Sequence, residues 1–181
     1  DSIVVQNYPV SDQAWAAPDA EQQFALLEQT VGLARTGRVL LNYSPGQQIS
    51  FHVGHDDPNR QNQLHQLQRH LAHLSRGTAD VSSQQDWPAE KLLRLVTEGL
   101  SVGIAVADDV DLKKAIERLA KQITETDKEL QRVDGKLKNA EFVSKAPPDV
   151  IAEHHERVRT LSRDRALLAN SEGQLRTMLG A

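Results

Sequence analysis

The chain has 181 residues and a formal net charge of −4, and 39% of its residues are hydrophobic but only 4% are aromatic. This composition allows one domain or two small ones with a modest aliphatic core. The absence of cysteine excludes a disulfide framework and a thiolate metal site. No apolar run approaches the roughly 20 residues of a membrane-spanning helix, and the first ten residues lack the features of a signal peptide. We therefore expect a cytoplasmic protein without a membrane partner.

The charge is unevenly distributed. Residues 1–108 hold 12 acidic and 7 basic side chains, whereas residues 109–181 hold 13 acidic and 14 basic ones. A mild basic bias of this kind suits phosphate contacts, although mixed charge is also typical of a solvated helix face.

The chain starts at Asp1, and Met178 is its one methionine. We therefore expect it to be part of a longer protein.

A long helix is predicted near the start of the chain. Residues 19–38 place four apolar side chains on one face at helical spacing, namely Phe24, Leu27, Val31 and Ala34. That stripe indicates one buried face and one solvent-exposed face.

Residues 46–107 predict a small α/β layer. Alternating apolar residues indicate strands, and two apolar runs on either side of Glu98 and Gly99 indicate a hairpin. Asp57 can cap a helix that starts at Pro58. The apolar stripe of that helix and the glycine that closes it are Leu64, Leu67, Leu71, Leu74 and Gly77. We expect a short sheet with one helix lying on it.

From Val110 onward the pattern is one of heptads. A first seam steps alternately by four and three residues through Leu112, Ile116, Leu119, Ile123, Thr126, Leu130, Val133 and Leu137. A second seam continues in the same way through Ile151, His154, Val158, Leu161, Arg165, Leu168, Glu172, Leu175 and Leu179. Two such seams predict an antiparallel coiled coil whose limbs, each roughly 40 Å long, bury one another. The polar residues of the second seam predict fraying there or packing against another element.

The segment between the seams predicts the tip of this hairpin, at about residues 139–149. Two adjacent prolines cannot continue the first helix, and Pro147 holds Ala146 out of the helical region, so we expect a short non-helical segment. Phe142 and Val143 either close the end of the seam or form a contact surface that the limbs hold far from the body.

The tip also carries a family signature. The residues Lys136, Leu137, Asn139, Phe142, Val143, Lys145, Ala146 and Pro147 match the pattern K-L-x-N-x-x-F-V-x-[KR]-A-P in order and spacing. This region resembles the C-terminal coiled-coil arm of valyl-tRNA synthetases. Two upstream segments also resemble that family: DSIVVQNYP at residues 1–9, and a segment that includes Arg35, Arg38, Asn42, Pro45 and Gly46. The positions that depart from the family pattern are Gly37, Tyr43, Ser44, His154 and His155.

The resemblance implies the C-terminal region of a class I aminoacyl-tRNA synthetase, valine–tRNA ligase, which joins valine to tRNA(Val) at the expense of ATP with magnesium. The implied partners are tRNA(Val), whose outer corner the arm contacts, and the rest of the synthetase chain. The whole enzyme is expected to be monomeric, whereas the present chain is expected to self-associate through the apolar face of residues 19–38. No cofactor and no catalytic site are expected within this chain.

The expected fold is α+β and mainly helical, with a small α/β layer followed by a long antiparallel two-helix coiled-coil arm. Residues 1–45 are then the tail of the anticodon-binding helical domain, and residues 46–107 are the small α/β domain. Residues 108–181 form the arm.

One motif calls for a separate explanation. His52 and His55 form an H-x-G-H pattern, which in class I synthetases contacts ATP phosphates. A nucleotide-binding fold needs several crossover units of about 30 residues or more, and residues 46–107 are too few for that. The same histidines with Asp56 and Asp57 make a possible three-ligand metal set, but Asp57 is already assigned as a helix cap. We therefore expect neither catalysis nor a metal here.

The leading functional hypothesis is an RNA-contacting arm, because RNA is recognised through phosphates, 2′-hydroxyls and stacking. The candidate tRNA-binding residues are Lys128, Arg132, Lys136, Lys138, Phe142, Lys145, Arg157, Arg159 and Arg163, with Phe142 as a stacking platform. Many of these side chains can instead form charge pairs within their own helix. The alternative hypothesis is a structural or protein-interaction coiled coil with no RNA role.

Overall fold

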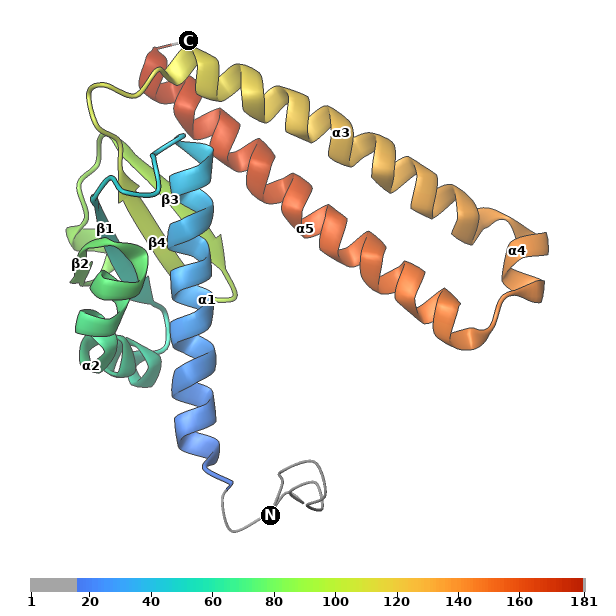
Figure 1. The fold of residues 1–181 in the computed structure, drawn as a ribbon, viewed down its shortest axis with the longest axis horizontal. Helices are drawn as coiled ribbons and strands as arrows, with labels where there is room; N and C mark the ends of the chain where they lie inside the picture. The colour runs from blue at the N-terminus through green and yellow to red at the C-terminus, as the bar shows by residue number, and fades with distance from the viewer. Residues whose placement is uncertain (1–15, 181) are drawn as a thin grey trace, which may run out of the picture.

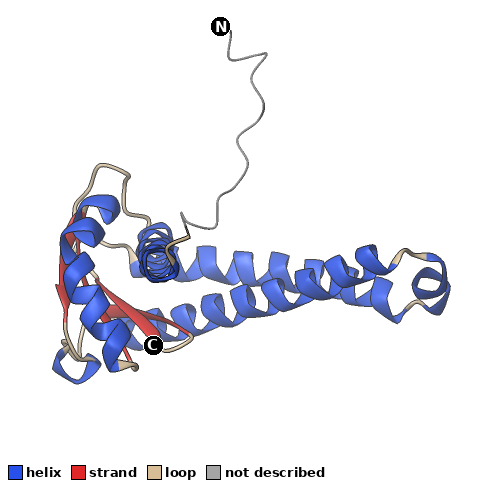
Figure 2. Cartoon of the chain, turned by 90° about the horizontal axis from the view of Figure 1, so that it is seen from below, coloured by secondary structure: helices blue, strands red, loops and turns tan. Residues whose placement is uncertain are grey.

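The computed structural model describes residues 16–180, so the predicted similarity of residues 1–9 lies outside the described part. The protein is mainly helical and contains one small four-stranded sheet (Figures 1 and 2). Its elements are α1 (Pro18–Leu40), β1 (Ile49–His55), α2 (Pro58–Ser75), β2 (Gly77–Val81), the short 3-10 helix η3 (Gln84–Asp86), β3 (Leu92–Thr97), β4 (Leu100–Ala105), α3 (Leu112–Lys138), α4 (Ala140–Lys145) and α5 (Pro148–Leu179).

The sheet is mixed and has the strand order β2-β1-β4-β3. Strands β1 and β2 are parallel and are joined through α2, as parallel neighbours require a crossover. Strand β4 pairs antiparallel with both β1 and β3. The predicted β3–β4 hairpin is confirmed, because Glu98 and Gly99 both adopt positive φ, 47° and 82°, as a two-residue hairpin turn requires.

Helix α2 starts as the sequence predicts and ends differently. The Asp57 carboxylate accepts a hydrogen bond of 2.8 Å from the amide of Asn59, and Pro58 is the first helical residue. The left-handed residue at the C-terminus is Arg76, with φ of 51°, and not Gly77. Glycine is required at position 77 for another reason, because a Cβ there would fall on the carbonyl oxygen of Ile49 in the neighbouring strand.

Both α1 and α2 lie on the same face of the sheet, whereas the sequence predicted only one helix there. Close approach of α1 is possible because Gly37 has no side chain, and a Cβ there would overlap Ile104 of β4. The predicted apolar stripe of α1 is partly wrong: Val31 and Ala34 are buried, but Phe24 is 66% exposed and Leu26 takes the buried position.

Arg38 joins the end of α1 to the end of α2. Its buried guanidinium donates hydrogen bonds to four backbone carbonyls, those of Ser44, Gln47, Ser75 and Arg76, at 2.5 to 3.1 Å. Burial lowers the pKa of Arg38 from its ordinary value. Two of these carbonyls also accept backbone hydrogen bonds, that of Ser44 from the amide of Gln47 and that of Arg76 from the amide of Ile49. Arg38 therefore adds a second partner at these two groups and links the ends of the two helices.

The long helices α3 and α5 run antiparallel and side by side, and α4 joins them (Figure 1). Residues of both predicted seams are buried, among them Leu119 and Val133 of α3 and Leu161 and Leu175 of α5. The second seam was predicted either to fray or to pack against another element. Helix α5 is one continuous helix of 32 residues and packs against β3, so the second alternative is confirmed. Two of the three polar seam residues form ion pairs: Arg165 pairs with Asp127 of the other limb at 3.1 Å, and Glu172 pairs with Arg176 at 2.8 Å.

The tip differs from the predicted non-helical segment. Residues Ala140–Lys145 form the short helix α4, with breaks at Asn139 and at Ala146, where ψ values of 107° and 143° place both residues in the extended region. Ala146 is held out of the helical region before Pro147, as predicted. The first limb, however, already ends at Lys138, and the helical character of residues 140–145 was missed. None of the helices within residues 16–180 combines the length and apolar character needed to cross a bilayer.

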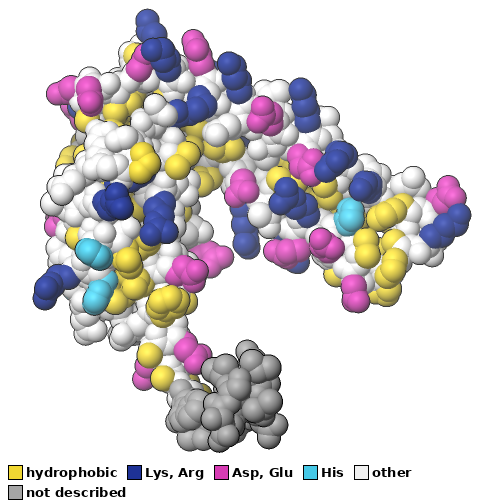
Figure 3. All heavy atoms as spheres, in the orientation of Figure 1, with side chains coloured by type: hydrophobic (Ala, Val, Ile, Leu, Met, Phe, Trp, Pro, Cys, Tyr) yellow, Lys and Arg dark blue, Asp and Glu magenta, His cyan; other side chains and the backbone are white. Residues whose placement is uncertain are grey.

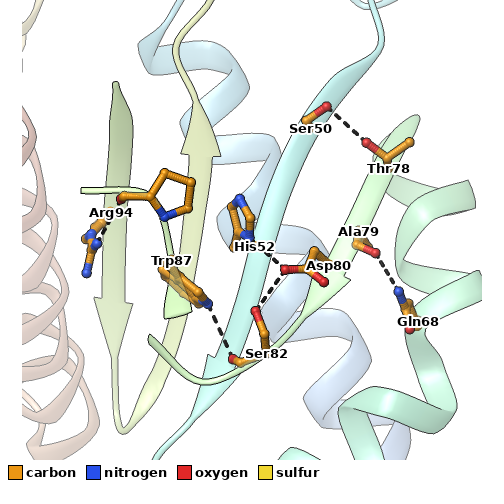
Figure 4. Close-up of polar contacts among 10 residues, drawn as sticks. Ser50, His52, Gln68, Thr78, Ala79, Asp80, Ser82, Trp87 and Arg94 are labelled. Atoms are coloured by element: carbon orange, nitrogen blue, oxygen red, sulfur yellow. Dashed lines mark hydrogen bonds and ion pairs between the residues drawn. The ribbon is translucent and has the colours of Figure 1, made fainter. Parts of the chain in front are cut away.

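Glutamine side chains cover parts of both edge strands. The Gln68 amide donates to the carbonyl of Ala79 in β2 at 2.7 Å (Figure 4). At the other edge, α5 lies beside β3, and the Gln174 amide both accepts from the amide and donates to the carbonyl of Arg94, each at 2.8 Å.

Replacing Gly77 with alanine is expected to lower the free energy of unfolding by about 1–3 kcal/mol, because the added methyl group overpacks a site bounded by backbone. Gly46→Ala is the matched control, since nothing lies within 4 Å of a Cβ at that position. Urea denaturation followed by circular dichroism measures both. Equal effects of the two substitutions would contradict the explanation.

The hydrogen bonds and the burial of the Tyr43 hydroxyl predict that the stability of the protein depends on pH. Its hydroxyl donates to the carbonyl of Ala105 at 2.9 Å and accepts from the amide of Ala107 at 2.8 Å, and burial raises its pKa. A raised folded-state pKa means that the tyrosine's contribution is fully present below the unfolded value of about 10 and is lost as pH rises through the folded value. The stability advantage of the natural chain over Tyr43→Phe, about 1 kcal/mol at neutral pH, should therefore shrink in denaturation measurements above about pH 10. A gap that is constant with pH would contradict this assignment.

Candidate nucleic-acid interface

The arm, residues 112–179, projects away from the sheet and from α1 as a long pair of helices (Figures 1 and 2). All nine candidate residues lie on it. Helix α3 carries Lys128, Arg132, Lys136 and Lys138, the tip helix α4 carries Phe142 and Lys145, and α5 carries Arg157, Arg159 and Arg163. The basic members are all exposed. Along the arm, basic and acidic side chains alternate, and hydrophobic side chains gather near its tip (Figure 3).

Several of the basic candidates already have acidic partners. Four of them pair with a carboxylate three or four residues away in the same helix, namely Arg132, Lys138, Lys145 and Arg159. Exposed pairs of this kind contribute little to stability, so an incoming phosphate can displace the carboxylate. Arg163 lies 4.0 Å from Glu98 of the hairpin turn. Within residues 16–180, the candidates without an ion pair are Lys128, Lys136 and Arg157.

The structure brings two of these three cations together across the limbs. Lys136 of α3 and Arg157 of α5 both line a groove of about 420 Å³, which also holds Arg132 and Glu129. The pKa of Glu129 lies below its ordinary value, first because Arg132 donates a hydrogen bond to it and also because Arg157 and Lys136 are close. The groove therefore holds three basic side chains, those of Arg132, Lys136 and Arg157, beside three carboxylates, those of Glu129, Glu153 and Glu156.

At the tip, Phe142 is half-buried and is not a free-standing platform. Its ring lies 5.4 Å from the ring of His154 on α5, with an angle of 51° between the planes. Phe142 also lines an open depression of about 490 Å³ together with Pro147 and Val150. The Asn139 side chain caps α4 by accepting hydrogen bonds from the amides of Glu141 and Phe142, and it thereby fixes the ring. Asn139 matched the family pattern, but its role as a cap was not predicted.

The two histidines of the H-x-G-H motif, His52 and His55, form hydrogen bonds with different neighbouring residues. His52 pairs with Asp80 at 2.9 Å on the polar face of the sheet, and the hydroxyl of Ser82 donates to the same carboxylate (Figure 4). These two hydrogen bonds, that from Ser82 first, hold the pKa of Asp80 below its ordinary value. His55 accepts a hydrogen bond from the amide of Asp57, and burial lowers its pKa.

Trp87 lies on the same face of the sheet and contacts His52, with 5.8 Å between the ring centroids. Its indole donates to the carbonyl of Ser82 at 3.3 Å, and the Arg94 guanidinium lies 5.6 Å from its ring (Figure 4). Within residues 16–180, no group of three histidine or acidic side chains is arranged to hold a metal ion.

Comparison with known proteins identifies the arm. Residues 111–176 match the family model described as the valyl tRNA synthetase tRNA binding arm. Similar curated proteins include valine–tRNA ligases of Francisella tularensis (32% identity over 87% of this chain), Symbiobacterium thermophilum (27% over 99%) and Thermotoga maritima (26% over 98%). The chain spans only about a fifth of the length of these relatives, from 17% to 20%.

The projecting helix pair and the matched arm place this protein among the aminoacyl-tRNA synthetases. More specifically, the chain belongs to the valyl-tRNA synthetase family, and residues 111–176 are its tRNA binding arm domain. The family resemblance found in the sequence is therefore confirmed.

Removing the cap of α4 tests the tip. Asn139→Ala is expected to speed amide hydrogen exchange at Glu141 and Phe142 about fivefold, because a cap contributes about 1 kcal/mol to its helix. Asn139→Asp keeps the side-chain acceptor and serves as the control, with exchange close to that of the natural chain. The cap assignment is wrong if both variants exchange alike.

Proposed function

We propose that this chain is the C-terminal tRNA-binding part of valine–tRNA ligase and that its arm contacts the outer corner of tRNA(Val). The observation that carries the proposal is the match of residues 111–176 to the tRNA binding arm, on a helix pair that projects from the body. The proposal assigns no catalytic role to this chain. The enzyme as a whole attaches valine to its tRNA with ATP and magnesium in the cytoplasm, and it acts as a monomer.

The proposal includes a division of labour along the chain. Residues 1–45 belong to the anticodon-binding helical domain, residues 46–107 form a small α/β domain, and residues 108–181 form the arm. In the arm, α3 and α5 make an antiparallel coiled coil. This finer description is supported by the heptad spacing of the buried residues Leu119, Val133, Leu161 and Leu175.

The arm is suited to an electrostatic mode of binding. Lys and Arg fix the position of a protein on nucleic acid through phosphate contacts that carry no sequence information. Lys128, Lys136 and Arg157 are exposed and form no ion pair that RNA binding would have to break. We therefore expect each of them to contribute more to tRNA affinity than the paired candidates do. Phe142 adds apolar surface beside them, at the tip, where an unstacked base or a sugar can contact its ring.

Charge reversal tests the mechanism. In Lys128→Glu/Lys136→Glu/Arg157→Glu, tRNA(Val) affinity should fall at least about tenfold, and the slope of log affinity against log salt should lose about two to three units. The matched control reverses three exposed charges of the body, in Arg60→Glu/Arg69→Glu/Lys91→Glu. This control has the same net charge and should retain most of the affinity and the slope. Filter binding or fluorescence anisotropy over a salt series measures both.

The alternative is a structural or protein-interaction role without RNA binding. Two large apolar side chains of α1, Phe24 and Val39, are 66% and 62% exposed, so self-association of this chain through α1 is expected. Light scattering with and without tRNA separates the two functions. Two results together would overturn the RNA-binding proposal. The chain would form a dimer whose size does not change when tRNA is added, and deletion of residues 109–181 would leave its affinity for tRNA unchanged.

A further inference from the structure

Both limbs of the arm are tied to the body at the arm root, residues 112–119 and 168–178. On α3, the Arg118 guanidinium donates to the carbonyls of Leu40 and Val39 in the last turn of α1, at 2.5 and 3.1 Å. A guanidinium suits this place, because the end of a helix presents carbonyls without helical partners and a partial negative charge.

The second limb has its own tie. The Gln174 amide of α5 forms two hydrogen bonds of 2.8 Å with the backbone of Arg94, one to its amide and one to its carbonyl. This pair of bonds reproduces the contact of a neighbouring strand. It therefore fixes the distance and the rotation of α5 relative to the sheet edge.

The linker between the sheet and α3 is held by a third side chain. The buried hydroxyl of Tyr43 bonds to the carbonyl of Ala105 at the end of β4 and to the amide of Ala107 in the linker. The three ties thus reach three different parts of the body: the end of α1, the edge strand β3, and the exit from β4.

Apolar packing alone would leave the direction of the arm less defined. Leu119 and Leu175 are fully buried at the arm root and join the core of the body. Apolar burial is not directional, whereas hydrogen bonds require both distance and angle. Because α3 is 27 residues long, a rotation of about 10° at the root moves the tip by about 7 Å.

We propose that Tyr43, Arg118 and Gln174 are positioning residues that fix the direction of the arm relative to the body, so that the candidate basic residues and the tip reach RNA in one geometry. The part that concerns RNA rests on the proposed function, whereas the fixed direction does not.

The absence of cysteine makes a direct distance measurement possible. Spin labels are attached at Gln29→Cys on α1 and Ala152→Cys on α5, both exposed positions. In the otherwise natural chain a single narrow distance distribution is expected. In Tyr43→Phe/Arg118→Met/Gln174→Leu the distribution should become at least about twice as wide, as expected for rocking by about 10° or more of a rod of this length.

Two controls separate direction from folding. Arg176→Met removes a guanidinium from the same root, but one that pairs only with Glu172 of its own helix, so it should leave the distribution narrow. A second label pair within the arm, Gln131→Cys and Ala152→Cys, should be unaffected by the triple substitution. If the triple variant loses its circular dichroism signal, Tyr43→Phe/Gln174→Leu replaces it.

The outcomes are distinct. An unchanged distribution in a folded variant, or a broad one in the natural chain, overturns the inference. Binding of tRNA is the second readout: the dissociation constant should rise about three- to tenfold, since a binding-competent direction is then populated only part of the time. If the natural chain does not bind tRNA, the proposed function fails for this chain, and the label distances still decide the direction of the arm.

Discussion

The arm exists because two apolar stripes bury one another. Single helices of this length are marginal in water without tertiary packing. The small aliphatic core of the body lies between the sheet and the helices α1 and α2, too far away to bury the distal part of the arm. Val133 and Leu161 are therefore buried only by the opposite limb. The outer faces of the two helices remain exposed to solvent and carry charged side chains, among them every basic candidate residue. The same constraint accounts for the form of the tip, which must reverse the chain within a few residues while keeping its own helix ends capped.

Local signals in the sequence predicted the elements that local chemistry determines. The Asp57 cap and the Glu98–Gly99 turn are patterns of neighbouring residues, and both were confirmed. The long helices α3 and α5 were also expected, and members of both predicted seams are buried. Contacts between distant residues have no such pattern. Phe24 satisfies the helical spacing of a buried residue, but the sheet meets α1 only further along, so its ring is exposed. Gly77 looked like the end of a helix and is instead a point of close approach between strands.

For the candidate interface, sequence placed the nine residues on the arm but did not rank them. The ranking depends on which charges are paired, and a cation such as Lys136 differs from Lys138 only in its surroundings. The three ties at the arm root were missed because side chains bonded to backbone carbonyls leave no trace in residue spacing. A weak signal existed in the departures from the family pattern: Gly37 contacts Ile104, Tyr43 holds the linker, and His154 contacts Phe142. These three of the five departures lie where two elements meet.

The two glutamines at the sheet edges have a consequence for association between molecules. An open edge strand presents unpaired amides and carbonyls that can recruit a strand from another chain. Gln174 occupies both backbone groups of Arg94 in β3, and Gln68 occupies the carbonyl of Ala79 in β2. These side chains block part of each edge of the four-stranded sheet, and each edge strand also carries a charged residue, Asp80 in β2 and Arg94 in β3. Both features oppose pairing with a strand of another molecule. The same amide that ties the arm thereby also keeps the sheet from growing.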